Sequence, residues 1–114
     1  MADEVILINV DDGLKRVMNN AKLYVRLLGK FKDDVTFKGI EKAFAEGDME
    51  TSKTAAHTFK GLTANLSLSE LYKQTVELEA QIKNGVLNKE QLAVVKDIYE
   101  KTLLETDKVI TKYE

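Results

Sequence analysis

The chain contains no proline and only six glycines in 114 residues, and its apolar residues recur three and four positions apart. Proline interrupts helices, whereas this apolar spacing places side chains on one face of a helix. The sequence therefore predicts an all-α fold with short turns. With 44% apolar residues, the length suits a single domain over residues 1–114 with one core.

The N-terminal segment departs from the helical pattern. The run from Val5 to Val10 is rich in β-branched residues, which is typical of a strand, but no second strand follows to pair with it. We expect residues 1–10 to form an extended or partly helical leader that packs on a helical bundle of residues 11–114.

Capping residues and apolar stripes predict the helices of the bundle. A short helix capped by Asp11 and Asp12 should precede a second helix near residue 20 and a third over residues 35–46, closed by Gly47. A fourth helix should run from the cap Asp48 to about residue 66. Capping boxes at residues 67–70 and 88–91 should begin the last two helices. These elements predict an antiparallel up-down-up-down four-helix bundle with a short extra N-terminal helix.

Composition excludes several classes of protein. The chain has no cysteine, so it has no disulfide or thiolate metal site. It has no run of about 18 uncharged apolar residues, and its acidic start does not fit a secretory signal. The net charge of −2, from 17 basic and 19 acidic residues, gives no field for nucleic acid or a membrane surface. We expect a cytoplasmic protein that binds neither.

The only histidine, His57, lies within the predicted fourth helix. At about 100° per residue, Ala55, Phe59, Leu62 and Leu66 form one narrow stripe, which we expect to face the core. His57 then lies roughly 180° from the centre of that stripe. Its imidazole is therefore expected to be exposed.

The neighbours of His57 on the same side of the helix are basic or small. They are Lys53 at i−4, Lys60 at i+3, Gly61 at i+4 and Ala64 at i+7. A glycine inside a helix lowers its stability by about 1 kcal/mol relative to alanine, so the presence of Gly61 calls for an explanation. Close approach by another molecule over the imidazole is such a reason.

This arrangement suits phosphoryl transfer. A neutral imidazole is a competent nucleophile near pH 7, and Lys60 one turn away can stabilise the negative charge that develops on the phosphoryl oxygens. The sequence shows no P-loop, kinase glycine loop or metal-ligand cluster. We expect the chain to depend on a partner for nucleotide and metal.

Several residues of the chain together match a known signature: Ala56, His57-Thr58-Phe59-Lys60-Gly61, Leu66, Leu71, Leu78 and Glu79. The pattern resembles that of histidine-containing phosphotransfer (HPt) domains, found in bacterial and eukaryotic multistep phosphorelays. Residues 13–16, the helix over residues 24–31 and Gly47-Asp48 also resemble the family's preceding helices. The resemblance therefore covers most of the chain.

The resemblance implies that His57 is phosphorylated by the aspartyl phosphate of a receiver domain and passes the group to another receiver. Lys60 would lie beside the phosphoryl group and Gly61 would leave clearance for the receiver, which brings the acidic residues and the magnesium ion. A basic or amide side chain on the next helix often helps in relatives, and Lys83 and Glu79 lie in that region. We expect Lys53, Ala64 and Lys83 to contribute to binding.

One position departs from the family pattern. Nine residues beyond the histidine the family usually has a leucine followed by glycine, whereas this chain has Ser67 after Leu66. We interpret Ser67 as a cap for the next helix, a structural substitution that leaves transfer intact.

Four other kinds of protein are compatible with a helical bundle, and the sequence conflicts with two of them. A haem bundle using Met18 or Met49 conflicts with an exposed His57 and lacks an attachment sequence, and a carboxylate di-metal bundle would need glutamate where Thr54 stands. A docking module that binds a receiver without taking phosphate, and one domain of a larger hybrid sensor kinase, both remain open. We expect a monomer.

Overall fold

The computed structural model describes residues 5–113 and is built from six helices. They are α1 (Val10–Arg16), α2 (Ala21–Asp33), α3 (Thr36–Glu46), α4 (Met49–Asn65), α5 (Ser69–Lys83) and α6 (Lys89–Tyr113). No strand occurs within residues 5–113, which confirms the all-α class. Within the same residues, no helix is both long enough and apolar enough to cross a membrane.

Most of the predicted helix ends are confirmed. Asp48 caps α4 by accepting a hydrogen bond from the backbone N–H of Thr51 at 3.0 Å. Gly47 ends α3 with φ of +67°, the left-handed conformation that glycine adopts without strain. These two residues set the start of the helix that carries His57.

Two predicted caps are wrong. Asn9, and not Asp11 or Asp12, caps α1 by accepting from the N–H of Asp12, so both aspartates lie inside the first turn. Ser67 does not cap α5, which begins at residue 69 without a side-chain cap. Ser67 has φ of +58°, and its hydroxyl donates to Asp12 at 2.5 Å instead.

Only one of the two hydrogen bonds of the predicted capping box forms at the start of α6. The side chain of Asn88 accepts from the N–H of Gln91 at 3.1 Å, as predicted. The amide of Gln91 does not return to the cap but donates to Gln74 of α5. Helices α5 and α6 pack side by side, and this hydrogen bond links them.

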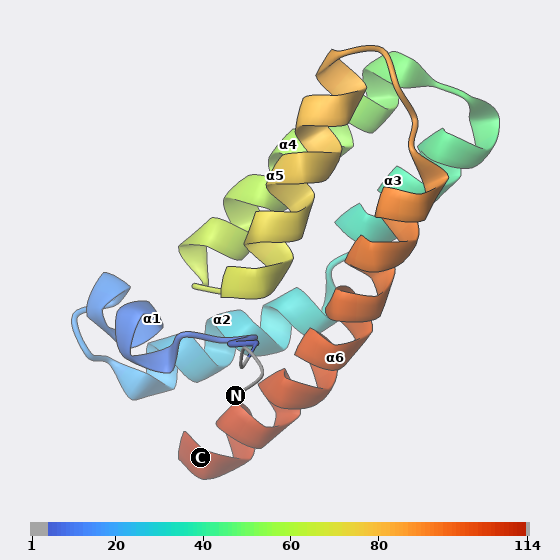
Figure 1. Cartoon of the computed structure of the whole chain (residues 1–114). Coiled ribbons are helices and arrows are strands. Elements are labelled where there is room, and N and C mark those ends of the chain that lie inside the picture. The colour runs from blue at the N-terminus through green and yellow to red at the C-terminus, as the bar shows by residue number, and fades with distance from the viewer. Residues whose placement is uncertain (1–4, 114) are drawn as a thin grey trace.

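The core is formed where the helices contact one another. Helix α4 packs between α3 and α5, and α6 packs against both α5 and α2 (Figure 1). Four aromatic rings from four helices meet in this core, with ring centroids 4.7 to 6.2 Å apart: Phe31, Phe37, Phe59 and Tyr99. Offset and edge-on contacts of this kind stabilise a core beyond simple burial.

The buried stripe of α4 is centred differently from the predicted one. The fully buried residues are Ser52, Ala56, Phe59 and Thr63, whereas Ala55 and Leu62 are only partly buried. The helix is covered from two sides, by α3 and by α5. His57 therefore lies roughly 130° from the stripe centre and not opposite to it, so it flanks the contact with α5.

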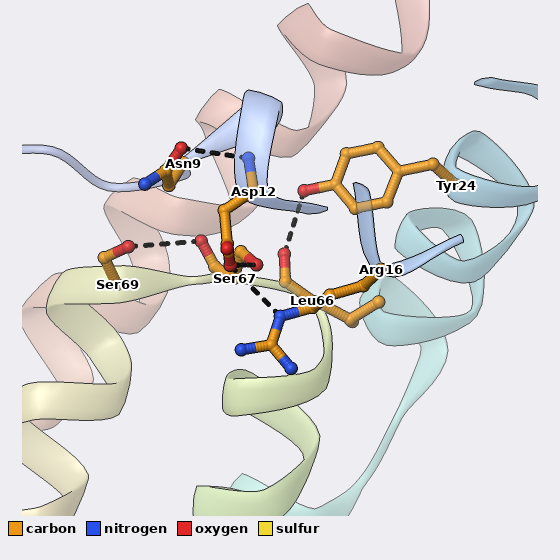
Figure 2. Close-up of polar contacts among 7 residues, drawn as sticks. All are labelled: Asn9, Asp12, Arg16, Tyr24, Leu66, Ser67 and Ser69. Atoms are coloured by element: carbon orange, nitrogen blue, oxygen red, sulfur yellow. Dashed lines mark hydrogen bonds and ion pairs between the residues drawn. The ribbon is translucent and has the colours of Figure 1, made fainter. Parts of the chain in front are cut away.

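The leader and α1 are fixed to the turn between α4 and α5. Ile8 is buried, and the N–H of Asn9 donates to the carbonyl of Ser67 at 2.9 Å. Residues 5–9 precede α1 without regular structure, as expected for the leader, and residues 1–4 lie outside the described residues. Figure 2 shows the Asn9, Asp12 and Ser67 contacts together at this turn.

Tyr24 of α2 completes this anchor. Its hydroxyl donates to the carbonyl of Leu66 at 2.8 Å (Figure 2), and burial raises the pKa of Tyr24 to about 12, so the donor stays protonated. Gly13 of α1 packs directly against the Tyr24 ring, where an added Cβ would lie only 2.4 Å from ring atoms. Residues far apart in sequence thus hold the C-terminal end of the His57 helix.

Candidate functional site

His57 lies in the middle of α4 with its side chain 69% exposed. This confirms the exposure that the sequence predicted. The imidazole faces solvent beside α5. A partner molecule can therefore reach the ring directly.

The imidazole is held by an acidic side chain from the neighbouring helix. The Nδ1 atom of His57 lies 2.9 Å from Oε2 of Glu79 on α5, and the Glu79 side chain is only 4% exposed. A carboxylate can only accept hydrogen bonds, so Nδ1 carries the proton and donates. In the neutral ring this leaves the lone pair on Nε2, which is the nucleophilic atom.

Two lysines share the same carboxylate. The Lys60 ammonium lies 2.7 Å from Oε1 of Glu79, and the Lys83 ammonium lies 3.5 Å from Oε2. Burial alone would raise the pKa of Glu79, but hydrogen bonds from Lys60 and His57 outweigh it and lower that pKa. The hydrogen bond to Glu79 likewise raises the pKa of Lys60. The site at neutral pH thus contains an ionised glutamate and charged lysines.

Gly61 occupies open space one turn after His57. An added Cβ would meet no atom within 4 Å outside its own helix, so no contact within the chain requires glycine here. Ala64, one turn further, is partly buried and lines a shallow cleft of about 240 Å³ beside Arg16 and Tyr72. Both small residues lie on the side of α4 that also carries His57.

A larger cleft of about 480 Å³ lies on the other side of the imidazole. It is lined by residues of α4 and α5: Lys53, Thr54, His57, Thr58, Glu79 and Lys83. Lys53 is half exposed, and among the residues that the structure describes its one ion pair is a 3.9 Å contact to Glu50. Lys53 and Lys83 therefore share a cleft with His57, and Lys60 shares the Glu79 carboxylate with it. Ala64 lines the smaller cleft instead.

The sequence indicated Glu79 beside Lys83 but did not predict that Glu79 contacts His57. Its position on α5 gave a signal, because it follows Leu78 at the edge of the buried stripe of that helix. A glutamate at such a position is almost never buried without a charged partner. The nearby histidine and lysines are those partners.

The described residues offer no metal site of their own. Within residues 5–113, no group of three or more histidine, cysteine, aspartate or glutamate side chains is placed to hold a metal ion.

A helical bundle with an exposed, carboxylate-held histidine and adjacent lysines defines a histidine phosphocarrier module. The family model for the Hpt domain matches residues 26–105, and the chain therefore belongs to the Hpt domain family. This confirms the resemblance in the sequence. Hpt domains are phosphotransfer modules of phosphorelay signalling, and not classical enzymes. No curated protein and no solved structure matches the chain.

Proposed function

We propose that this chain is a phosphorelay intermediate, in which His57 accepts a phosphoryl group from the aspartyl phosphate of a receiver domain and passes it to another receiver. The observation that carries this proposal is the 69% exposed His57, held at Nδ1 by Glu79, within a chain of the Hpt family. A buried histidine could not serve successive partners.

The transfer step follows from the tautomer. Nε2 of His57 attacks phosphorus, the N–P bond forms and the P–O bond to the aspartate breaks, with its electron pair leaving on the aspartate carboxylate. The Nδ1 proton stays on the ring, which becomes cationic, and the Glu79 carboxylate balances this charge. Onward transfer is the same step in reverse to a second aspartate.

Lys60 and Gly61 would support the reaction in different ways. Lys60 adds positive charge next to the phosphorylated ring, where negative charge develops in the transition state. Gly61 leaves space for the receiver over the imidazole, which agrees with the absence of any contact around it. Lys53 and Ala64 flank the same surface, and we assign them to partner binding.

The remaining chemistry would come from partners. We place the magnesium ion on the receiver domain and the nucleotide on a hybrid sensor kinase or other upstream kinase. We also infer that residues 1–114 form one Hpt domain, that α3 to α6 form its up-down-up-down four-helix bundle, and that it works as a cytoplasmic monomer. A monomer leaves the His57 surface free for successive partners.

The test is phosphoryl uptake from a receiver. Purified protein is incubated with several receiver domains, each charged on its aspartate by a small phosphodonor, and examined by intact mass and peptide mapping. We expect an acid-labile, base-stable phosphoryl group on His57 and none in His57→Gln. Lys101→Gln, an exposed substitution outside the His57 cleft, controls for surface perturbation.

Two outcomes would count against the proposal. Stable binding of a receiver without phosphate on His57, over the whole panel, would favour a docking module. Phosphate on a residue other than His57 would leave the geometry around Glu79 without a function.

A further inference from the structure

The two carboxylate oxygens of Glu79 are not used equally. Oε1 accepts from Lys60 alone, at 2.7 Å. Oε2 accepts from Nδ1 of His57 at 2.9 Å and contacts the Lys83 ammonium at 3.5 Å. Because His57 and Lys83 share one oxygen, the Lys83 ammonium lies within 6.4 Å of Nδ1.

The two lysines also differ in how firmly they are held. The Lys60 side chain is 26% exposed and makes the shorter contact, whereas the Lys83 side chain is 56% exposed and its contact is long for a hydrogen bond. Lys83 can therefore leave Glu79 at small cost. Lys60 cannot, because a buried carboxylate without a cation is strongly unfavourable.

Phosphorylation of His57 creates a new demand for positive charge. A phosphoryl group carries between one and two negative charges near neutral pH and offers three strong acceptor oxygens. The 480 Å³ cleft next to His57 has room for it, and Lys83 lines this cleft whereas Lys60 does not. Of the two lysines on Glu79, the less firmly held one is thus also the one that lines the cleft.

We propose that phosphorylation of His57 moves the Lys83 ammonium from Glu79 to the phosphoryl group, while Lys60 stays on Glu79. Lys83 then is the residue that touches the transferred group. Lys60 adds its charge from its place on Glu79 without contacting the phosphoryl group, and it is a positioning residue because it keeps that carboxylate ionised and hydrogen-bonded to Nδ1. This division of roles rests on the proposed function of His57 as phosphate acceptor.

The experiment uses phosphoramidate, which phosphorylates histidine directly, so that it does not depend on finding a receiver. Phosphorylated protein is titrated by ³¹P NMR to obtain the pKa of the phosphoryl group. The variants are Lys83→Met, Lys60→Met and, as matched control, Lys101→Met, since Lys101 is 60% exposed, pairs with a carboxylate four residues earlier as Lys83 does, and does not line the cleft. The Nδ1 proton and ¹⁵N shifts report the His57–Glu79 bond before phosphorylation.

A cation in contact with the phosphoryl group favours its more charged form. We expect Lys83→Met to raise the phosphoryl pKa by about one unit, with the Nδ1 signals unchanged. Lys101→Met should leave both readouts as in the wild type. Lys60→Met should change the Nδ1 signals and lower thermal stability, with a smaller effect on the phosphoryl pKa.

The opposite pattern would overturn the inference. In that pattern the phosphoryl pKa stays the same in Lys83→Met, or it changes mainly in Lys60→Met. If phosphoramidate labels His57 but no receiver does, the proposed relay function fails while the assignment of Lys83 is still decided by the titration. If neither donor labels His57, both are wrong.

Discussion

Nδ1 of His57 on α4 lies 2.9 Å from Oε2 of Glu79, which is 22 residues away on α5. The bond joins an exposed ring to a buried carboxylate, so it fixes the ring without covering it. A ring held at one nitrogen exposes the other nitrogen in a defined orientation, which is the pre-organisation that transfer to a partner needs. The contact between α4 and α5 therefore matters for chemistry as well as for stability.

Replacing Gly61 should separate folding from docking. Gly61→Ala removes a flexible residue from a helix and should stabilise the protein by about 0.5–1 kcal/mol. Gly61→Gln should slow phosphoryl uptake from a receiver by roughly tenfold or more, equivalent to at least about 1.4 kcal/mol in the barrier. Stopped-flow or rapid-quench uptake assays measure the rate, and thermal unfolding measures the stability.

Gly39 of α3 provides the control for Gly61, because an added Cβ there also meets no atom within 4 Å. Gly39→Gln should leave receiver-dependent uptake unchanged. Direct labelling by phosphoramidate should be the same in all these variants. An equal loss of uptake for the two glutamine substitutions would contradict a docking role for Gly61.

Gly13→Ala should destabilise the N-terminal anchor. The new Cβ would lie 2.4 Å from the Tyr24 ring, so helix α1 or the ring must shift. Overpacking of this kind typically costs about 1–3 kcal/mol. Urea unfolding monitored by circular dichroism gives the free energy, and a variant as stable as the wild type would show that α1 is not held as described.

Ser67 should respond differently to glycine and to alanine. Its φ of +58° is strained for any residue with a Cβ, and its hydroxyl donates to Asp12. Ser67→Ala keeps the strain and loses the bond, so it should cost about 1 kcal/mol. Ser67→Gly also loses the bond but relieves about 1–2 kcal/mol of strain, so it should be at least as stable as the wild type. Thermal unfolding of both variants tests this order, and a glycine variant less stable than the alanine variant would refute it.

Stability should fall in acid through Asp12. Hydrogen bonds from Ser67 and Arg16 lower the pKa of Asp12 below the 3.8 of an unfolded chain. A group whose pKa is lowered on folding stabilises fully above its unfolded value, and the effect is lost as pH falls through the folded value. The free energy of unfolding should therefore drop below about pH 4 more steeply in the wild type than in Asp12→Asn. Parallel pH profiles would exclude this contribution.

The sequence was sufficient to predict the helices and the exposure of His57, since these depend on local patterns. Gly47 and Asp48 act within one turn of the helices that they end and begin, and both hold in the structure. The Hpt family match confirms the resemblance drawn from the residues around His57. Local capping and periodicity are thus enough for the class of fold.

What could not be predicted depends on contacts between distant residues. Ser67 fits a capping box locally, but Asp12, 55 residues earlier, takes its hydroxyl and the turn adopts a left-handed conformation. The buried stripe of α4 differs from the predicted one because two helices pack against α4, whereas periodicity alone places a single partner on one face. The role of Glu79 needed the pairing of α4 with α5, which no spacing within either helix reveals.

The most direct test of the carrier function is a two-receiver pulse-chase. One receiver labelled with ³²P on its aspartate is mixed with this protein and a second, unlabelled receiver, and samples are quenched over time. We predict that label appears on His57 first and then on the second receiver, and that His57→Gln abolishes both. Label that reaches the second receiver equally well with His57→Gln, or that stays on the first receiver in every mixture, would contradict the account.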